Sequence, residues 1–155
     1  MTYRPKKSLF AMDEGKLLGH IISKDGIRID PARVEAIQQI EQPRNKKEIQ
    51  SFNGKLNFLR RFIPNLAEHL REITSMLKKY SQVKWTEEVV KSFNLVKLAI
   101  SSAPILISPN YTRDFILFSF ASEHTLAVVL MQKREGVEKP IAFFQSDYKR
   151  WSIEI

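Results

Sequence analysis

One segment, residues 45–63, carries the side chains whose types and spacing could contact another molecule. An α-helix turns by about 100° per residue, so the side chains of this segment can be assigned to faces. The face opposite its apolar stripe carries Gln50, Gly54, Asn57, Phe58, Arg61 and Lys47, with Lys46 beside them. Amides and an aromatic ring next to cations are typical of a surface that contacts sugars or the minor groove of a nucleic acid. Lys46 and Lys47 would then contact phosphates.

Gly54 and Phe58 each have a second interpretation. A glycine inside a helix costs about 1 kcal/mol relative to alanine, and on the outer face it would let a bulky partner approach the backbone. Alternatively, Gly54 relieves the crossing of two helices. Phe58 would in that case pack on a neighbouring element, as most helical aromatic residues do.

The positive charge of the chain is concentrated in its first half. The formal net charge is +8; residues 1–84 hold 17 Lys and Arg against 9 Asp and Glu, whereas residues 85–155 hold 8 of each. A concentrated basic segment attracts polyanions, and nucleic acid is the commonest of these inside cells. A solvated, lysine-rich helical surface would give the same counts.

Composition argues against several other classes of protein and site. The chain has no cysteine, so it has no disulfide or thiolate site, and its 3 histidines (His20, His69 and His124) are too scattered for an imidazole site. We therefore predict no metal site. The apolar run Leu126–Met131 is far shorter than the ~20 residues of a membrane span, and no apolar signal core follows the basic N-terminus. We expect an intracellular protein, in cytoplasm or nucleus, with no membrane partner.

The elements expected before this segment are a hairpin and a short helix. Two β-rich runs flank Asp25-Gly26, a strong signal for a hairpin turn whose two positions need positive φ. Asp30-Pro31 then favours a helix start, because Asp30 can cap it and Pro31 loses no hydrogen bond. Asn45, with Glu48 three residues later, predicts the start of the next helix, which we expect to reach Ile63.

The rest of the chain is predicted to add helices and then a sheet. Leu66, Leu70, Ile73 and Leu77 outline a third helix, and Thr86 opens a fourth. Strands are expected at residues 115–120, 125–133 and 141–145, with a linker containing Gly136–Pro140. The predicted fold class is α+β: a β-hairpin, a three-helix bundle, a linking helix and a three-stranded antiparallel sheet.

Several stretches of the sequence resemble one family along nearly the whole chain. They are LLGHIISKDGI (17–27), DPARVEAI (30–37), KEIQSF (47–52), FLRRFIP (58–64), KWTEE (84–88), APIL (103–106) and DFIL (114–117). In this order they resemble the reverse transcriptases of gypsy-type LTR retrotransposons, where the palm ends and the tethered ribonuclease H domain begins. The amino-acid sequence of these stretches is most similar to that of copies in plant genomes.

The resemblance implies a role for each part of the chain. Residues 1–30 would be the palm edge, with Gly19 and His20 at the primer grip; residues 31–80 would be the thumb. Residues 81–155 would be a linking helix and an incomplete ribonuclease H-like domain. The thumb helix of retroviral relatives lies along the minor groove of the template–primer, and positions matching Gln50, Gly54 and Phe58 contact it. The implied partners are an RNA–DNA hybrid or DNA duplex and the rest of the polyprotein.

The resemblance also implies missing catalytic residues. The polymerase carboxylates, which hold two Mg²⁺ ions, lie upstream in this family, and this chain has no Asp-Asp pair. The ribonuclease H motif Thr-Asp-Ala-Ser corresponds here to Ser119-Phe120-Ala121-Ser122, with Phe120 at the metal-binding aspartate. The second acid aligns with Ile155, one residue beyond Glu154. Asp114 and Glu123 are expected to be ordinary surface charges. We predict no catalytic residue and no cofactor, with Mg²⁺ bound only by the complete enzyme.

Two alternatives to a duplex-holding fragment remain open. A domesticated protein–protein interaction module would use the unfinished apolar sheet, including Phe118 and Phe120, as its interface. A relic of a decayed element would have no function, and its exposed sheet edge would favour aggregation.

Overall fold

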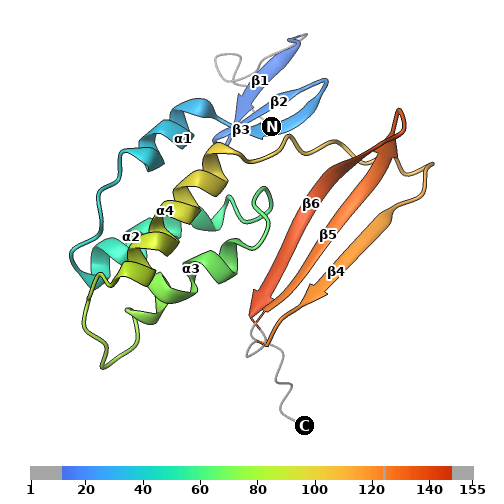
Figure 1. The fold of residues 1–155 in the computed structure, drawn as a ribbon. Helices are drawn as coiled ribbons and strands as arrows, with labels where there is room; N and C mark the ends of the chain where they lie inside the picture. The colour runs from blue at the N-terminus through green and yellow to red at the C-terminus, as the bar shows by residue number, and fades with distance from the viewer. Residues whose placement is uncertain (1–11, 124, 148–155) are drawn as a thin grey trace, which may run out of the picture.

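The computed structural model describes residues 12–123 and 125–147 of the 155-residue chain, which form two antiparallel sheets and four helices. Figure 1 shows the helices packed together, with the first sheet at one end of them and the second sheet alongside. In chain order the elements are β1 (Glu14–Leu17), β2 (His20–Ser23), β3 (Gly26–Ile29), α1 (Pro31–Gln38), α2 (Lys46–Asn57), α3 (Leu66–Ser75), α4 (Glu87–Ser101), β4 (Ile116–Ala121), β5 (Thr125–Arg134) and β6 (Val137–Asp147). The predicted α+β class is confirmed.

The first sheet has one strand more than the expected hairpin. A turn at Leu18 and Gly19, both with positive φ, divides the first β-rich run into β1 and β2. The hairpin of β2 and β3 forms where it was expected, but Lys24 and Asp25 make its loop. Gly26 is the first residue of β3, where a side chain would collide with the carbonyl group of Leu106. The requirement for glycine therefore comes from this close approach as well as from its φ of 134°.

Helix α2 begins as the sequence predicts and ends earlier. The side chain of Asn45 accepts a hydrogen bond from Glu48 N, and Glu48 accepts one from Arg44 N, one residue before the cap. The expected continuation of this helix to Ile63 is wrong: α2 ends at Asn57, and tight turns follow it. Two of their hydrogen bonds run from Leu59 N to Leu56 O and from Phe62 N to Leu59 O. Since side chains three residues apart are eclipsed in such turns, Leu59 and Phe62 are both buried.

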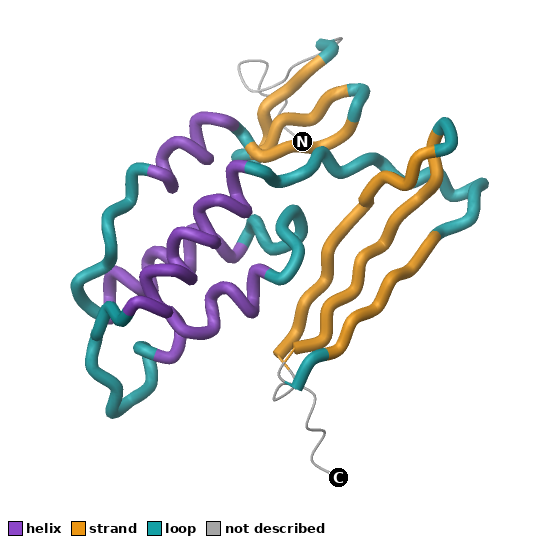
Figure 2. The backbone as a smooth tube through the Cα atoms, viewed as in Figure 1, coloured by secondary structure: helices purple, strands orange, loops and turns teal. Residues whose placement is uncertain are grey.

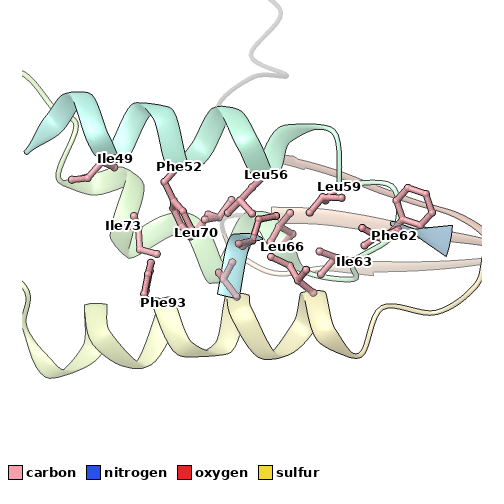
Figure 3. Packing of buried hydrophobic residues seen from close by; sticks show 14 of the residues in the cluster. Ile49, Phe52, Leu56, Leu59, Phe62, Ile63, Leu66, Leu70, Ile73 and Phe93 are labelled. Carbon is pink, nitrogen blue, oxygen red and sulfur yellow. The ribbon is translucent and has the colours of Figure 1, made fainter. Parts of the chain in front are cut away.

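One apolar core joins α2, α3 and α4. Figure 3 shows side chains of α2 meeting those of α4, with Phe52 and Phe93 among them. Helix α4 is tied on its other side to α1, because Lys97 Nζ donates to Gln38 O and Gln38 Nε2 donates to Lys97 O. The helix expected to be a linker is thus an integral part of the helical core.

The second sheet is more extended than the sequence predicts. Glu135 and Gly136 have positive φ and form a tight turn, so β6 starts at Val137 and the expected linker Gly136–Pro140 lies mostly in this strand. Pro140 is tolerated there because the ladder is irregular opposite it, between Leu130 and Met131.

Strand β6 attaches the second sheet to the loop between α2 and α3. Figure 2 shows this loop, in teal, between the helices and β6. Phe143 N donates to Arg61 O at 3.1 Å. The side chain of Gln145 accepts from Ala67 N at 2.7 Å and donates to Ile63 O at 2.5 Å. The irregular end of α2 is therefore where helices and sheet meet.

Candidate nucleic-acid interface

The outer face of α2 is exposed along its length. Lys47, Gln50, Gly54 and Asn57 all lie at the surface. A Cβ atom added to Gly54 would meet no atom of another described element within 4 Å, so no helix crossing in the described part of the chain explains this glycine. The structure thus leaves the backbone at Gly54 open to a partner, between two amide side chains.

The two lysines predicted to contact phosphates differ in their surroundings. Lys47 is exposed, whereas Lys46 is half-buried and its Nζ donates to Lys78 O at 2.6 Å, after the end of α3. An ammonium group has three donors, so Lys46 keeps two for another acceptor.

Phe58 is not the exposed aromatic side chain that the helical pattern predicts. It is the C-cap of α2, is half-buried and packs against the hydrophobic core. The ring of His20 meets it edge-on with centroids 5.6 Å apart, and Arg33 Cζ lies 4.1 Å from its centroid. The alternative interpretation, packing on a neighbour, therefore describes Phe58 correctly. Its ring packs against His20 of β2, in the first sheet.

His20 lies between two phenyl rings. Besides Phe58 it contacts Phe62, with ring centroids 4.9 Å apart and planes only 24° from parallel. Its Nε2 atom is buried and has no hydrogen-bond partner within the described part of the chain. Burial lowers the pKa of His20, and the positive charges of Arg61 and Arg33 lower it further. Both effects favour the neutral form of this imidazole.

Arg33 has a structural role that the sequence does not indicate. Its guanidinium covers Gly19 so closely that a side chain at Gly19 would collide with it, and its Nη1 atom donates to Leu18 O at 3.4 Å. Together with the contact to Phe58, this arginine holds the β1–β2 turn against the end of α2. An exposed arginine in the first turn of a short helix gives no sequence signal for such a role.

The predicted position of Arg61 on the outer face assumed that α2 continues to Ile63, but α2 ends at Asn57. Arg61 sits in the turns after α2, is exposed, and its guanidinium carbon lies 5.3 Å from the Phe62 ring centroid. Two further polar atoms in this part of the chain, Asn53 Oδ1 and Arg60 Nε, are buried with no partner among the described residues. The structure thus brings Gly19, His20 and Phe58 together. Arg61 lies near them, because its guanidinium group is close to the Phe62 ring, which stacks on His20. Gln50, Gly54 and Lys47 form a separate, open face.

The chain is similar to reverse transcriptase and to Pol polyproteins of viruses and transposons. Residues 85–151 match the RNase H-like domain found in reverse transcriptase. The chain is 32% identical over 145 residues to the Gag-Pol polyprotein of walleye dermal sarcoma virus, and 36% identical over 138 residues to a retrovirus-related Pol polyprotein from transposon 297 of Drosophila melanogaster. It is also 36% identical over 113 residues to an uncharacterized mitochondrial protein of Arabidopsis thaliana, covering 72% of this chain and 71% of that protein. The chain is thus similar to part of the retroviral and retrotransposon Pol polyproteins, and it carries the RNase H-like domain match of reverse transcriptase.

The match to Pol polyproteins covers most of this chain but only a small part of each polyprotein. It takes in 92% of this chain and 8% of the viral polyprotein, and 88% of this chain and 13% of the Drosophila one. Among solved structures, foamy viral protease-reverse transcriptase in complex with dsDNA matches with a TM-score of 0.77 and 28% identity, covering 92% of this chain and 30% of that chain. The same enzyme in complex with an RNA/DNA hybrid matches with the same score and identity, covering 92% of this chain and 20% of that chain.

The resemblance to ribonuclease H domains implies that a complete domain holds Mg²⁺ through an aspartate at the position of Phe120. Phe120 lies in β4, opposite Ala127 of β5, and its side chain is 60% exposed. A phenyl ring offers no oxygen ligand. Across residues 12–123 and 125–147, no group of three or more His, Asp or Glu side chains is placed to hold a metal ion. The described residues at this position therefore do not fit the ion. Ile155, which the resemblance aligns with the second acid, and its neighbour Glu154 lie outside the described residues.

Within the described residues, no helix is both long and apolar enough to cross a membrane.

Proposed function

We propose that this chain is part of a gypsy-type, plant-like reverse transcriptase and holds an RNA–DNA or DNA duplex against the outer face of α2. In this proposal residues 31–80 act as the thumb, and residues 1–30 are the palm edge. The open backbone at Gly54, flanked by Gln50 and Asn57, is the observation that carries it. The match to a reverse transcriptase in complex with dsDNA or a hybrid supports it.

The proposed activity is binding alone. Phe120 replaces the metal-binding aspartate that the resemblance implies, and the chain contains no Asp-Asp pair. We infer that the polymerase site comes from the rest of the polyprotein and that Mg²⁺ is bound only by the complete enzyme. Binding by this chain should then be electrostatic, tolerant of sequence and weakened by salt.

Substitution of Gly54 tests the proposal sharply, because stability and binding should change in opposite directions. Gly54→Ala should stabilise the fold by about 0.5–1 kcal/mol, since alanine favours the helix and the added methyl group meets no protein atom. The same methyl group should weaken binding of a fluorescent RNA–DNA hybrid several-fold, measured by anisotropy. Gly54→Leu should weaken it further.

Asn94→Ala provides the matched control. Asn94 is exposed on α4, outside the face of α2, so its replacement by a better helix former should stabilise that helix without changing the affinity. Unchanged hybrid binding by Gly54→Leu, from a chain that is folded, would rule out this face as the duplex surface.

A further inference from the structure

A cavity of about 770 Å³ lies at the other end of the molecule from α3, between the two sheets and the segment that follows α4. The β2–β3 turn lines it with Lys24 and Asp25, and the β5–β6 hairpin lines it with three charged residues. These are Arg134, Glu135 and Lys139. Arg113, from the segment before β4, completes the charged lining. The volume is typical of sites that take a group the size of a nucleotide.

Cations outnumber carboxylates in this cavity by four to two. Lys24 forms an ion pair with Asp13, but both side chains are almost fully exposed, so this pair is weak. Arg134 donates to the carbonyl oxygen of Ser108. Within the described residues, no ion pair joins Arg113 or Lys139 to a carboxylate. Two cations with no carboxylate partner and a third that is weakly paired give this space a positive potential.

A buried glutamine fixes the wall that carries Arg113. Gln132 is 0% exposed, and its Oε1 atom accepts from Asn110 N at 2.9 Å while Nε2 donates to Asn110 O at 2.8 Å. Nε2 also lies 3.3 Å from Arg113 O. A buried amide saturated by backbone groups makes a rigid support. The segment presenting Arg113 is thus held in place before any ligand arrives.

Backbone hydrogen bonds hold the other two walls to the same segment. Ile27 and Leu106 exchange two, at 2.7 and 2.9 Å, which fixes the β2–β3 hairpin. Ile107 N donates to Pro140 O at 2.9 Å, which fixes β6 beside Lys139. The cations therefore come from three chain segments whose relative positions are set by the fold, and a pre-organised cluster loses little entropy on binding.

We propose that this cavity is a phosphate-binding site, separate from the α2 face, and that the phosphates belong to a nucleic-acid strand. The guanidinium groups of Arg113 and Arg134 suit phosphate oxygens, because each presents donors in a planar fork. The proposal rests on the proposed function only for the source of the phosphates. A free polyphosphate would use the same cations.

The test compares two double variants of equal charge. Arg113→Ala/Lys139→Ala removes two cations from the cavity, whereas Lys91→Ala/Lys133→Ala removes two exposed lysines outside it. For the cavity variant, the affinity for an RNA–DNA hybrid should fall about tenfold at low salt. The slope of log affinity against log salt should become shallower by roughly 2, one for each lost phosphate contact. The control variant should keep the slope of the original chain.

Pyrophosphate, followed by amide chemical shifts in NMR, separates the two sources of phosphate. Pyrophosphate should shift the signals of Asn110 and Glu135, which line the cavity, in the original chain and in Gly54→Ala, and not in the cavity variant. Pyrophosphate shifts with an unchanged hybrid affinity in the cavity variant would overturn the assignment to a strand. Absence of both effects would overturn the site itself. Failure of the original chain to bind hybrid would instead overturn the proposed function, and would leave the pyrophosphate result to decide the cavity.

Discussion

The helical region and the second sheet of this chain differ in how completely they bury their apolar residues. Every helix contributes to one core, in which Phe52, Leu56 and Phe62 are at most 1% exposed. The second sheet exposes 64% of Leu117, 60% of Phe120 and 56% of Phe144. The strand register places Phe118 and Phe120 on one face of the sheet and Leu117 on the other. Within the described residues, both faces of the sheet are therefore only partly covered.

This difference shows that a region can form regular secondary structure without burying its apolar side chains in a core. A three-stranded sheet can satisfy its internal hydrogen bonds and still lack the second layer that buries its apolar face. The sheet depends instead on its attachment to the helical region through Gln145 and Phe143. We therefore expect the sheet to open at a lower free energy than the helices do.

The largest expected effect tests the contrast directly. Phe52→Ala should lower the free energy of unfolding by about 3–5 kcal/mol, because it opens a cavity beside Phe93, whose ring centroid lies 5.1 Å away. Phe120→Ala removes the same atoms from an exposed position and should change it by less than about 0.5 kcal/mol. Urea denaturation followed by helical circular dichroism measures the first change, and hydrogen exchange of the amides of β4, β5 and β6 measures the second. Equal losses would show that the sheet is as well packed as the helices.

A smaller effect is expected from cutting the attachment of the sheet. Gln145→Ala leaves Ala67 N and Ile63 O without their side-chain partner. The cost should be about 1–3 kcal/mol. Hydrogen exchange should show faster exchange in β4, β5 and β6 and little change in α2.

Gln39→Ala is the control for this variant, because Gln39 is an exposed glutamine at the end of α1, a helix that lies away from the second sheet (Figure 1). Uniformly faster exchange in Gln145→Ala would mean that sheet and helices unfold as one unit.

The parts of the fold that the sequence predicted are those fixed by local chemistry. Asn45 starts α2, Asp30 starts α1, and Asp25-Gly26 marks a hairpin, because each acts on residues within a few positions. The end of α2 was missed, since a change from α-helix to tight turns alters only which carbonyl accepts each hydrogen bond. Strand β1 was missed because its four residues include only one large apolar side chain, Leu17.

The candidate site was likewise predictable only where it depends on residues close together in the sequence. The open face around Gly54 followed from helical geometry alone, and the structure leaves it open. The surroundings of Phe58 did not follow, because they depend on His20 and Arg33, which are distant in sequence. Helical periodicity predicts which side of a helix a residue lies on, and it contains no information about what another element places there.

The smallest expected effect concerns His20, where the first sheet meets the end of α2. Its folded-state pKa is lowered from 6.5, mainly by burial and further by Arg61 and Arg33, so the unfolded chain binds its proton more readily. The neutral ring therefore contributes stability that is complete above pH 6.5 and is lost as the pH falls through the folded-state pKa. Urea midpoints at pH 7.5 and 5.5 should differ less in His20→Phe, which keeps a ring between Phe58 and Phe62, than in the original chain. His69→Gln serves as the control for the loss of one histidine, and an undiminished pH dependence in His20→Phe would assign the effect to other groups.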